Sequence, residues 1–456
     1  MCLMPRILIA AVLLFVLGLP FLHQNPQRFQ PDLESAAMQD EVIVRLHPPF
    51  TSLADEVLES RLGGEIIDRL PELDSLRLRL TGETPAQAVT RLARLPHVEM
   101  AEPNHRLSAT VIPTDPFYSA QSAYLALIQA PEAWDVELGL DSVLVAVLDS
   151  GLDLTHPDLQ GRFWTNPLED EDNRLDDDNN GCVDDRHGCS FVSEESIDSS
   201  CTEPAQGLVT DDNGHGTFVS GIIAAQASNG IGVSGVAPGV TVVPVKILDC
   251  KGGGTAVEAA QGILYAARIG ARVANISFGA DGESVTLATA IREAYDRYGM
   301  VIIAATGNEG GSRVTFPARL PQTIAVASSG TPADPSARSP FSDWGPEVSF
   351  AAPGLNIIST LPPEFCSNGW QCVEGQPYAV SSGTSFAAPI ASALAALLIS
   401  HTPFLTPEQV RGIIMSTAEP LPDVTTPNWD GAGRIRMRDA LAQPRFYLGA
   451  AGIAKQ

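Results

Sequence analysis

Short apolar segments alternate with longer amphipathic segments between residues 117 and 443, and this alternation limits the fold more than any other feature of the sequence. The apolar runs predict strands at residues 143–148, 241–247, 273–276, 301–305 and 323–327. The segments 256–269 and 285–298 have the spacing of helices. Strands that are apolar throughout belong to parallel sheets with helices on both faces. The sequence therefore predicts an α/β domain with a mostly parallel central sheet over residues 117–443.

Residues 40–107 predict a separate, smaller α+β domain. Strands are expected at 42–46, 64–70, 75–80 and 98–107, and helices at 53–62 and 84–95. Thr84 before Pro85 is a typical start of the second helix. The order β-α-β-β-α-β is the ferredoxin-like pattern. Residues 108–116 contain two prolines and no periodicity, so they are expected to form an exposed junction that can be cleaved.

Two apolar stretches bear on membrane contact and export. Residues 385–399 contain Pro389 and are short for a membrane span, so they predict a buried core helix. Residues 1–24 join a positively charged start to an apolar run, as export signals do, but no small-x-small cleavage site follows. We expect either a cleaved signal peptide or a retained membrane anchor, then a linker at 25–39 and a tail at 444–456. The protein is thus expected to be secreted or periplasmic, or membrane-anchored outside the cytoplasm.

Cysteines and charges narrow the environment and the partners. Six cysteines lie beyond Cys2, and an even number in an exported chain favours disulfides. Cys366 and Cys372 flank a short polar loop and are the best pair, while the pairing of the other four stays open. The formal net charge of −26 repels phosphate backbones, so nucleic acid is not an expected partner, and it suits bound cations.

Three segments combine a reactive side chain with the backbone setting that catalysis needs. Asp149 ends an apolar strand, and the carboxyl ends of parallel strands line the active crevice. His215 lies between two glycines at a helix start, where the helix dipole favours a neutral imidazole that can accept a proton. Ser385 begins a helix whose free N–H groups can hold an anion. Alone each residue fits a turn or a helix cap; together they predict nucleophilic catalysis.

In their order Asp, His, Ser, the segments VLVAVLDSGLDLTHPDL, DDNGHGTFVSGIIAA and SSGTSFAAPIASALAALL resemble those of the subtilisin-like serine proteases, the subtilases, and the thermitase-like members in particular. The resemblance spans residues 115–442 and implies a three-layer fold and serine endopeptidase activity on proteins or peptides. It implies that Asp149 orients the imidazole, His215 is general base and then acid, and Ser385 forms the acyl-enzyme. Asn308, within AATGNEGG, corresponds to the family's oxyanion donor.

The resemblance extends to the substrate pocket and to the first domain. Ser277, Phe278, Gly279 and Gly307 correspond to walls of the pocket, where an extended peptide pairs with the backbone. Phe278 stands where the family usually has Leu, so a narrower pocket is expected. Phe218 stands where a second His is common, which leaves its packing open. Residues 40–107 resemble the family's propeptide, an intramolecular chaperone and inhibitor, and imply an autoprocessed zymogen.

One calcium site is predicted from the acidic segment 169–185, which contains nine acids. Asp176, Asp178, Asn180 and Asp184 match the start of an EF-hand-like loop, D-x-D-x-N-G-x-x-D. The position of the bidentate Glu is taken by a histidine, and Asp185 is a substitute for it. Carboxylate and amide oxygens are the ligands that Ca²⁺ prefers.

A second calcium site is implied by the resemblance alone. Its oxygen ligands would be the side chains of Asp115, Asp158 and Asn229 and the carbonyls of Ala227, Ile231 and Val233. No organic cofactor is expected.

Three other interpretations use some of the same features. A non-enzymatic scaffold with the subtilase fold would normally lack a catalytic residue, and none is missing here. An acidic, calcium-binding adhesion module would need only residues 169–185. An esterase would use the same three residues on esters, although the chain lacks the G-x-S-x-G elbow of α/β-hydrolases at Ser385.

Overall fold

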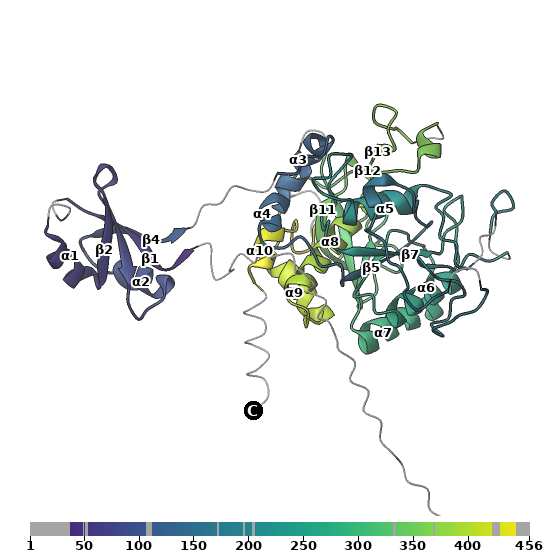
Figure 1. Ribbon diagram of the computed structural model, residues 1–456, viewed down its shortest axis with the longest axis horizontal. Helices are drawn as coiled ribbons and strands as arrows, with labels where there is room; N and C mark the ends of the chain where they lie inside the picture. Colours follow the sequence, from purple (N-terminus) through teal and green to yellow (C-terminus); the bar gives the residue numbers. More distant parts are fainter. Residues whose placement is uncertain are drawn as a thin grey trace, which may run out of the picture. The chain divides into compact units, whose positions relative to one another are not determined.

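The computed structural model describes residues 37–48, 50, 53–105, 112–170, 173–194, 197–202, 206–331, 334–367, 370–421 and 429–443. The chain divides into two compact units, Met1–Leu107 and Ser108–Gln456 (Figure 1). The expected export segment 1–24, most of the linker 25–39, the first part of the junction 108–116 and the tail 444–456 lie outside the described residues.

The smaller unit has the predicted element order. Its elements are β1 (Ala37–Leu46), α1 (Asp55–Leu62), β2 (Gly64–Leu70), a 3₁₀ turn η2 (Pro71–Leu73), β3 (Ser75–Leu80), α2 (Pro85–Leu92) and β4 (Val98–His105). The antiparallel sheet has the order β2-β3-β1-β4, with the first and third strands at its centre. Thr84 caps α2 through a capping box with Gln87, as predicted. β1 starts at Ala37, inside the segment expected to be linker.

The larger unit is built on a seven-stranded sheet in the order β11-β10-β9-β8-β5-β7-β6, and every pair is parallel. The strands are β5 (Leu144–Asp149), β6 (Cys189–Ser190), β7 (Thr241–Lys246), β8 (Val273–Ile276), β9 (Val301–Ala305), β10 (Thr323–Ser329) and β11 (Val348–Pro353). The five predicted strands are all present; β8 and β9 have the predicted bounds, and the ends of the other three differ by at most two residues. β6 and β11 were not predicted, because β6 is a two-residue strand and VSFAAP carries no clear period.

Helices cover both faces of this sheet and give it three layers (Figure 1). Val145 and Val147 of β5 pack on one face with α5 (His215–Ala224) and α8 (Thr384–His401). Ala146 and Leu148 point to the other face, with α6 (Ala256–Arg268) and α7 (Val285–Tyr298). Because neighbouring side chains of a strand alternate between faces, an apolar run such as 144–148 requires both layers of helices.

The remaining elements surround this core. They are α3 (Tyr118–Leu127), α4 (Ala130–Trp134), η3 (Pro157–Leu159), the antiparallel pair β12 (Ile357–Thr360) and β13 (Tyr378–Ser381), η4 (Pro363–Ser367), α9 (Pro407–Thr417) and α10 (Met437–Leu441). α8 is long and apolar enough to cross a membrane, but 89% of it is buried inside the protein, which confirms the prediction of a core helix. All six cysteines beyond Cys2 form disulfides, namely Cys182–Cys189, Cys201–Cys250 and the predicted pair Cys366–Cys372.

Candidate active site

Asp149 and His215 form the first half of the site. Asp149 is the last residue of β5 and is fully buried. Its carboxylate lies 2.8 and 2.9 Å from His215 Nδ1 and also accepts the Ser150 N–H at 2.8 Å. A carboxylate only accepts hydrogen bonds, so Nδ1 carries the proton and Nε2 is left as the acceptor. The predicted pairing of these two side chains is therefore present in the structure.

Asp211 builds the turn that carries His215, and sequence reasoning missed it. Its carboxylate accepts the Ser150 hydroxyl at 2.8 Å, and that hydroxyl accepts the Gly216 N–H at 2.9 Å. The same carboxylate accepts the N–H groups of Asn213, Gly214 and Thr217. Asp211 lies three residues before Gly214, the N-cap of α5, so the usual capping position did not identify it.

Opposing effects set the pKa of His215, which lies above its ordinary value. Burial is the largest single influence and lowers the pKa, but the charge and hydrogen bond of Asp149 and the charge of Asp211 together outweigh it. The expectation from the helix N-terminus alone was a neutral ring. The net direction is opposite, because the neighbouring carboxylates of Asp149 and Asp211 favour the charged ring.

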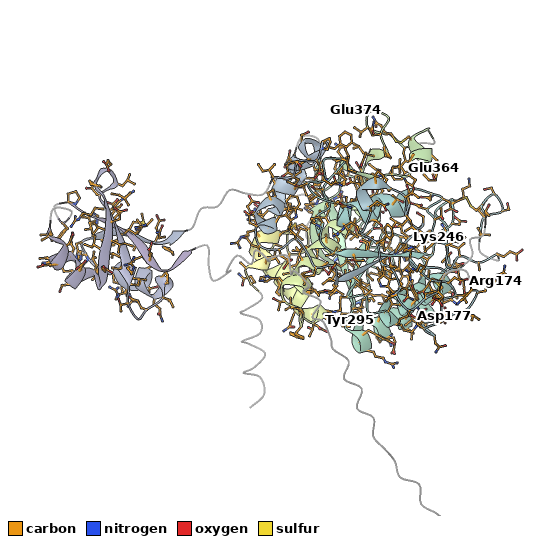
Figure 2. All side chains as sticks on the ribbon, viewed as in Figure 1. Arg174, Asp177, Lys246, Tyr295, Glu364 and Glu374 are labelled. Atoms are coloured by element: carbon orange, nitrogen blue, oxygen red, sulfur yellow. A yellow bond between two sulfur atoms is a disulfide. The ribbon has the colours of Figure 1, made fainter. Side chains whose placement is uncertain are left out.

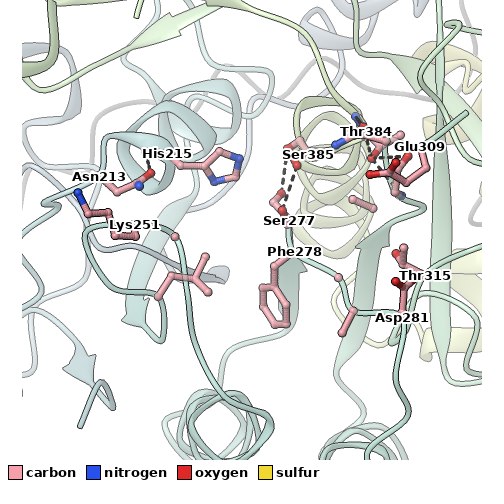
Figure 3. A pocket seen from close by; sticks show the side chains of 17 residues that line it. Asn213, His215, Lys251, Ser277, Phe278, Asp281, Glu309, Thr315, Thr384 and Ser385 are labelled. Carbon is pink, nitrogen blue, oxygen red and sulfur yellow. Dashed lines mark hydrogen bonds between the residues drawn. The ribbon is translucent and has the colours of Figure 1, made fainter. Parts of the chain in front are cut away.

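Ser385 forms the other half, in the first turn of α8. Its hydroxyl donates to the Ser277 carbonyl oxygen at 3.0 Å, and the Ser277 hydroxyl donates to the Ser385 carbonyl oxygen at 2.8 Å. Figure 3 shows His215 facing this pair across the pocket. Among the described residues, the Ser385 hydroxyl has no hydrogen bond to His215. The structure thus brings the predicted nucleophile to the site but does not hydrogen-bond it to the predicted base.

Asn308 lies in the loop after β9, beside the start of α8. Its Oδ1 accepts both the backbone N–H and the hydroxyl of Thr384, each at 2.9 Å. Because a backbone N–H can only donate, this contact fixes which end of the amide is oxygen. The Nδ2 end is therefore free to donate into the pocket. The Ser385 N–H, in the first turn of α8, has no intrahelical acceptor and is a second donor there.

A cavity of about 620 Å³ connects the two halves of the site (Figure 3). Its lining includes His215, Asn308 and Ser385 together with all four predicted wall residues, Ser277, Phe278, Gly279 and Gly307. Phe278 and Gly279 also line a neighbouring cavity of about 350 Å³. Phe278 thus forms a wall shared by two cavities.

Phe218, the departure from the family pattern, packs in an aromatic cluster behind the site. Its ring is fully buried, with centroids 5.2 Å from Trp370 and 4.6 Å from Phe386. Phe386 follows the candidate nucleophile and its ring lies 5.6 Å from the His215 ring. The aromatic side chain therefore fills an apolar space that a second histidine would make polar.

Lys246 is a buried cation that sequence reasoning also missed (Figure 2). Its ammonium group donates to the carbonyl oxygens of Ser150 and Leu248, at 2.5 and 3.0 Å, and to Asp212 at 2.6 Å. Three acceptors match the three protons of the group, so the charge is satisfied. The lysine ties the end of β7 to the strand end at Asp149 and to the turn before His215.

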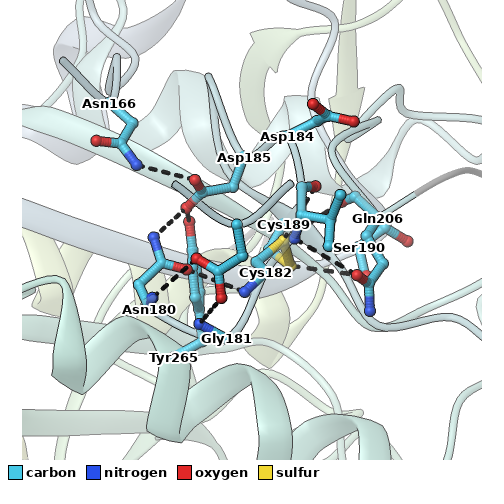
Figure 4. The surroundings of a disulfide bond; sticks show 12 residues. Asn166, Asn180, Gly181, Cys182, Asp184, Asp185, Cys189, Ser190, Gln206 and Tyr265 are labelled. Atoms are coloured by element: carbon cyan, nitrogen blue, oxygen red, sulfur yellow. Dashed lines mark hydrogen bonds between the residues drawn. A yellow bond between two sulfur atoms is a disulfide. The ribbon is translucent and has the colours of Figure 1, made fainter. Parts of the chain in front are cut away.

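The acidic segment brings together the carboxylates of Glu169, Asp178 and Asp185, with one oxygen of each within 4.8 Å of the others. Asp185 accepts hydrogen bonds from Asn166, Asn180 and Tyr265 (Figure 4). Burial raises the pKa of Glu169 and of Asp185. This group is the cluster of described residues that could hold a metal ion.

Only Asp178 of the four predicted ligands lies in that cluster. Asp176 accepts the N–H groups of Asn180 and Gly181, and Asp184 accepts the N–H of Arg174. The Asn180 amide donates to Asp185. These side chains close turns of the loop on itself, so their oxygens face backbone N–H groups instead of the cluster.

The residues of the second predicted calcium site also meet. Asp115 accepts the N–H groups of Ser228 and Asn229 at 2.8 and 3.0 Å. Asp158 accepts the Asn229 amide at 2.8 Å and the Val233 N–H at 2.9 Å. Both carboxylates are buried, and burial, aided by the charge of Asp115, raises the pKa of Asp158 to about 6. The loop that carries Ala227 and Ile231 thus wraps two acids.

Comparison with known proteins identifies the family. The profile of the subtilase family, peptidase S8, matches residues 141–433. A thermophilic serine proteinase from Bacillus sp. (strain AK1) is 32% identical over 372 residues, 81% of this chain and 80% of that protein. Thermitase from Thermoactinomyces vulgaris is 33% identical over 307 residues, 67% of this chain and 91% of that protein. The chain is a subtilisin-like serine endopeptidase. It belongs to the subtilase family.

The N-terminal unit and the fold have matches of their own. The profile of the fervidolysin N-terminal prodomain matches residues 24–104. Fervidolysin from Fervidobacterium pennivorans, a keratinolytic enzyme related to subtilisin, is 25% identical with a TM-score of 0.59, over 90% of this chain and 61% of that one. A protease from Pseudoalteromonas arctica is 27% identical with a TM-score of 0.57, over 73% of this chain and 99% of that one. The chain therefore carries a prodomain before a subtilisin-type catalytic unit.

Proposed function

We propose that the protein hydrolyses peptide bonds through Asp149, His215 and Ser385 and an acyl-enzyme intermediate. The observation that carries this proposal is the lining of one cavity by the paired His215, by Ser385 and by Asn308. The Ser385 hydroxyl turns from the Ser277 carbonyl toward His215 Nε2, which takes its proton as Oγ attacks the scissile carbonyl. His215 then gives that proton to the leaving amine, and water releases the acyl group by the same steps in reverse.

Charge on the substrate oxygen is stabilised by two donors at the start of α8. Asn308 Nδ2 is free because Thr384 occupies Oδ1, and the Ser385 N–H lacks a helical acceptor. Such donors act on the tetrahedral intermediate more than on the ground-state carbonyl, so they lower the barrier. Ser277, Phe278 and Gly279 on one side and Gly307 on the other hold the substrate chain in an extended form.

The protein is made as a zymogen and exported. Its prodomain, residues 40–107, inhibits the catalytic unit of residues 117–443. The inhibition ends when the active site of the catalytic unit cuts the junction at 108–116. An apolar segment within residues 1–24 directs export, either as a cleaved signal or as a membrane tether. The partners are therefore protein or peptide substrates and, as intramolecular inhibitor, the chain's own prodomain.

Processing of the precursor tests the nucleophile. Ser385→Ala should leave the full precursor uncut, whereas Ser382→Ala, at an exposed serine three residues earlier, should mature normally. Mass spectrometry of both products gives the N-terminus. Removal of the prodomain from Ser385→Ala, with no other protease present, would contradict self-cleavage. Turnover of esters without turnover of peptide amides by the mature enzyme would favour the esterase interpretation instead.

Calcium binds the Glu169–Asp178–Asp185 cluster and the loop around Asp115 and Asp158. Each place gathers buried or half-buried carboxylates whose mutual repulsion a divalent cation would offset, and each supplies only oxygen ligands. In the second site the Asn229 side chain and the carbonyls of Ala227, Ile231 and Val233 complete the ligands. Ca²⁺ there would stabilise the folded loops and takes no part in bond cleavage.

Metal content of the mature enzyme tests both sites. Native mass spectrometry should give two Ca²⁺ ions for the wild type and one for either Glu169→Gln or Asp158→Asn, and the exposed Glu347→Gln should keep both. At calcium concentrations 100 times Kd, each ion would add about 2.7 kcal/mol to the free energy of unfolding. A full complement of calcium in Glu169→Gln would rule out the acidic cluster as a site.

A further inference from the structure

Asp343 carries a buried carboxylate that has no role in the proposed catalytic steps. It lies between β10 and β11, and only 1% of its surface is exposed. Burial raises the pKa of its carboxyl group, so the fold meets a cost to keep a charge here. A buried acid of this kind is retained only where its oxygens meet donors, and its donors belong to one loop.

That loop is Gly307–Gly311, which carries Asn308. One oxygen of Asp343 accepts the Gly311 N–H at 2.7 Å, and the carboxylate also accepts the N–H of Glu309. In return the Asp343 N–H donates to the Gly307 carbonyl oxygen at 3.0 Å. The carboxylate and its backbone therefore hold the loop at its first, third and fifth residues.

Residues that flank Asp343 form further hydrogen bonds with the same loop. The Gly310 N–H donates to the Phe341 carbonyl oxygen at 2.7 Å, and the Trp344 N–H donates to the Gly311 carbonyl oxygen at 2.9 Å. Backbone hydrogen bonds on both sides of the carboxylate thus join residues 341–344 to residues 307–311. A loop held by this many hydrogen bonds has little freedom to move relative to the pocket.

Close approach at Gly307 shows how tightly the two segments fit. A Cβ at Gly307 would lie 2.2 Å from Asp343 Oδ2, and the φ of +112° there also favours glycine. The Asp343 carboxylate therefore lies directly against Gly307, the residue that precedes Asn308. The amide of Asn308 is oriented by Thr384, through Oδ1, and the Thr384 hydroxyl also accepts the Gly307 N–H at 3.2 Å. Asp343 and Thr384 thus both hold the backbone of this loop, whereas Thr384 alone orients the amide.

We propose that Asp343 is a positioning residue that sets the placement of Asn308 for oxyanion stabilisation. The inference rests on the proposed function of Asn308. Asp343 touches neither substrate nor the reacting atoms; it acts by fixing the backbone from which Nδ2 reaches the developing charge. Because a displacement of about 1 Å can lower a rate about 100-fold, the placement of this loop has a direct kinetic consequence.

A double-mutant cycle between Asp343 and Asn308 tests this role on the mature enzyme with a peptide amide substrate. Asn308→Ala should lower kcat about 100- to 1000-fold. Asp343→Ala should lower it about 10- to 100-fold in the wild-type background. In the Asn308→Ala background the same change should lower kcat less than about 3-fold, because the donor that this loop carries is already gone. Concentrations are taken from covalent titration of Ser385, so unfolded protein does not count.

Two further variants separate positioning from general stability. Asp343→Asn keeps the shape and one acceptor oxygen, so it should fold and show a smaller loss of kcat with the same coupling to Asn308. Asp430→Ala removes another carboxylate that accepts a loop N–H, that of Leu421 at 3.0 Å, and should leave kcat unchanged. Equal losses from the Asp343 variants in both Asn308 backgrounds, or wild-type kcat in Asp343→Ala, would overturn the proposal. A wild-type kcat in Asn308→Ala would instead overturn the proposed function of Asn308 itself.

Discussion

The two halves of the active site differ in how far the folded chain has already assembled them. Asp149 is fully buried and hydrogen-bonded to His215, and the surrounding turn is held by Asp211 and Lys246. Ser385 is open to the cavity, and its hydroxyl is bonded to the Ser277 carbonyl. The proposed base is in place before substrate arrives, while the proposed nucleophile must turn toward it.

This difference follows from what each half has to do. A histidine that becomes charged needs a fixed carboxylate beside it, and burial makes that pairing strong. The nucleophile must admit a substrate carbonyl, so it cannot be enclosed in the same way. Catalytic hydrogen bonds are often formed only in the substrate complex, and the proposed mechanism requires the bond between His215 and Ser385 to form at that stage.

The largest expected effect comes from removing the base. His215→Ala should lower kcat by about 10⁶, because Ser385 then loses its proton acceptor while the rest of the pocket stays intact. Steady-state hydrolysis of a peptide amide by titrated enzyme measures this. A loss below tenfold would show that the assembled half is not coupled to the nucleophile.

Asp149→Asn probes the pairing within the assembled half. We expect kcat to fall by about 10⁴, since an amide in place of the carboxylate favours the wrong tautomer of His215. Folding should be preserved, because the two side chains have the same shape. If kcat stays near that of the wild type at neutral pH, the hydrogen bond between Asp149 and His215 has no catalytic role.

Lys246→Met sharpens the comparison through stability. The change leaves Asp212 and two carbonyl oxygens without their donor, so it should lower the free energy of unfolding by about 3–5 kcal/mol. Lys251 lies five residues further on and is exposed at the cavity, so Lys251→Met should change it by less than about 0.5 kcal/mol. Denaturant titration compares them, and equal stabilities would show that the buried cation does not hold the assembled half together.

The smallest expected effect concerns the pH at which activity falls on the acid side of its optimum. The pKa of His215 is raised, so kcat/KM should fall as the pH drops through a pKa above 6.5, where the protonated ring can no longer accept a proton. Through linkage, the same charged ring stabilises the fold below its unfolded pKa, and this contribution is lost as the pH rises through the folded value. A pH–rate profile with its acid limb below pH 6.5 would contradict the raised pKa.

The residues that sequence reasoning identified share a local signal. Asp149 ends an apolar run, and His215 and Ser385 begin helices, so period and capping rules locate them without a structure. The element order of the smaller unit and five of the seven strands of the larger sheet could be predicted for the same reason. The Cys366–Cys372 pair is equally local, because only a short loop separates the two residues.

The residues that it missed act between distant segments. Asp343 meets Gly311 across 32 positions of sequence, and Lys246 meets Ser150 across 96. Glu169 joins Asp185 only after the acidic loop has folded on itself. None of these partners leaves a local pattern, since each contact forms only when the tertiary fold brings the two segments together.

Covalent labelling with a fluorophosphonate tests the catalytic trio most directly. The reagent should add to one residue of the mature enzyme, Ser385, and the rate of addition should collapse in His215→Ala even though the serine is still present. Tandem mass spectrometry locates the adduct. An adduct on another serine, or undiminished labelling of Ser385 without the imidazole, would contradict the account.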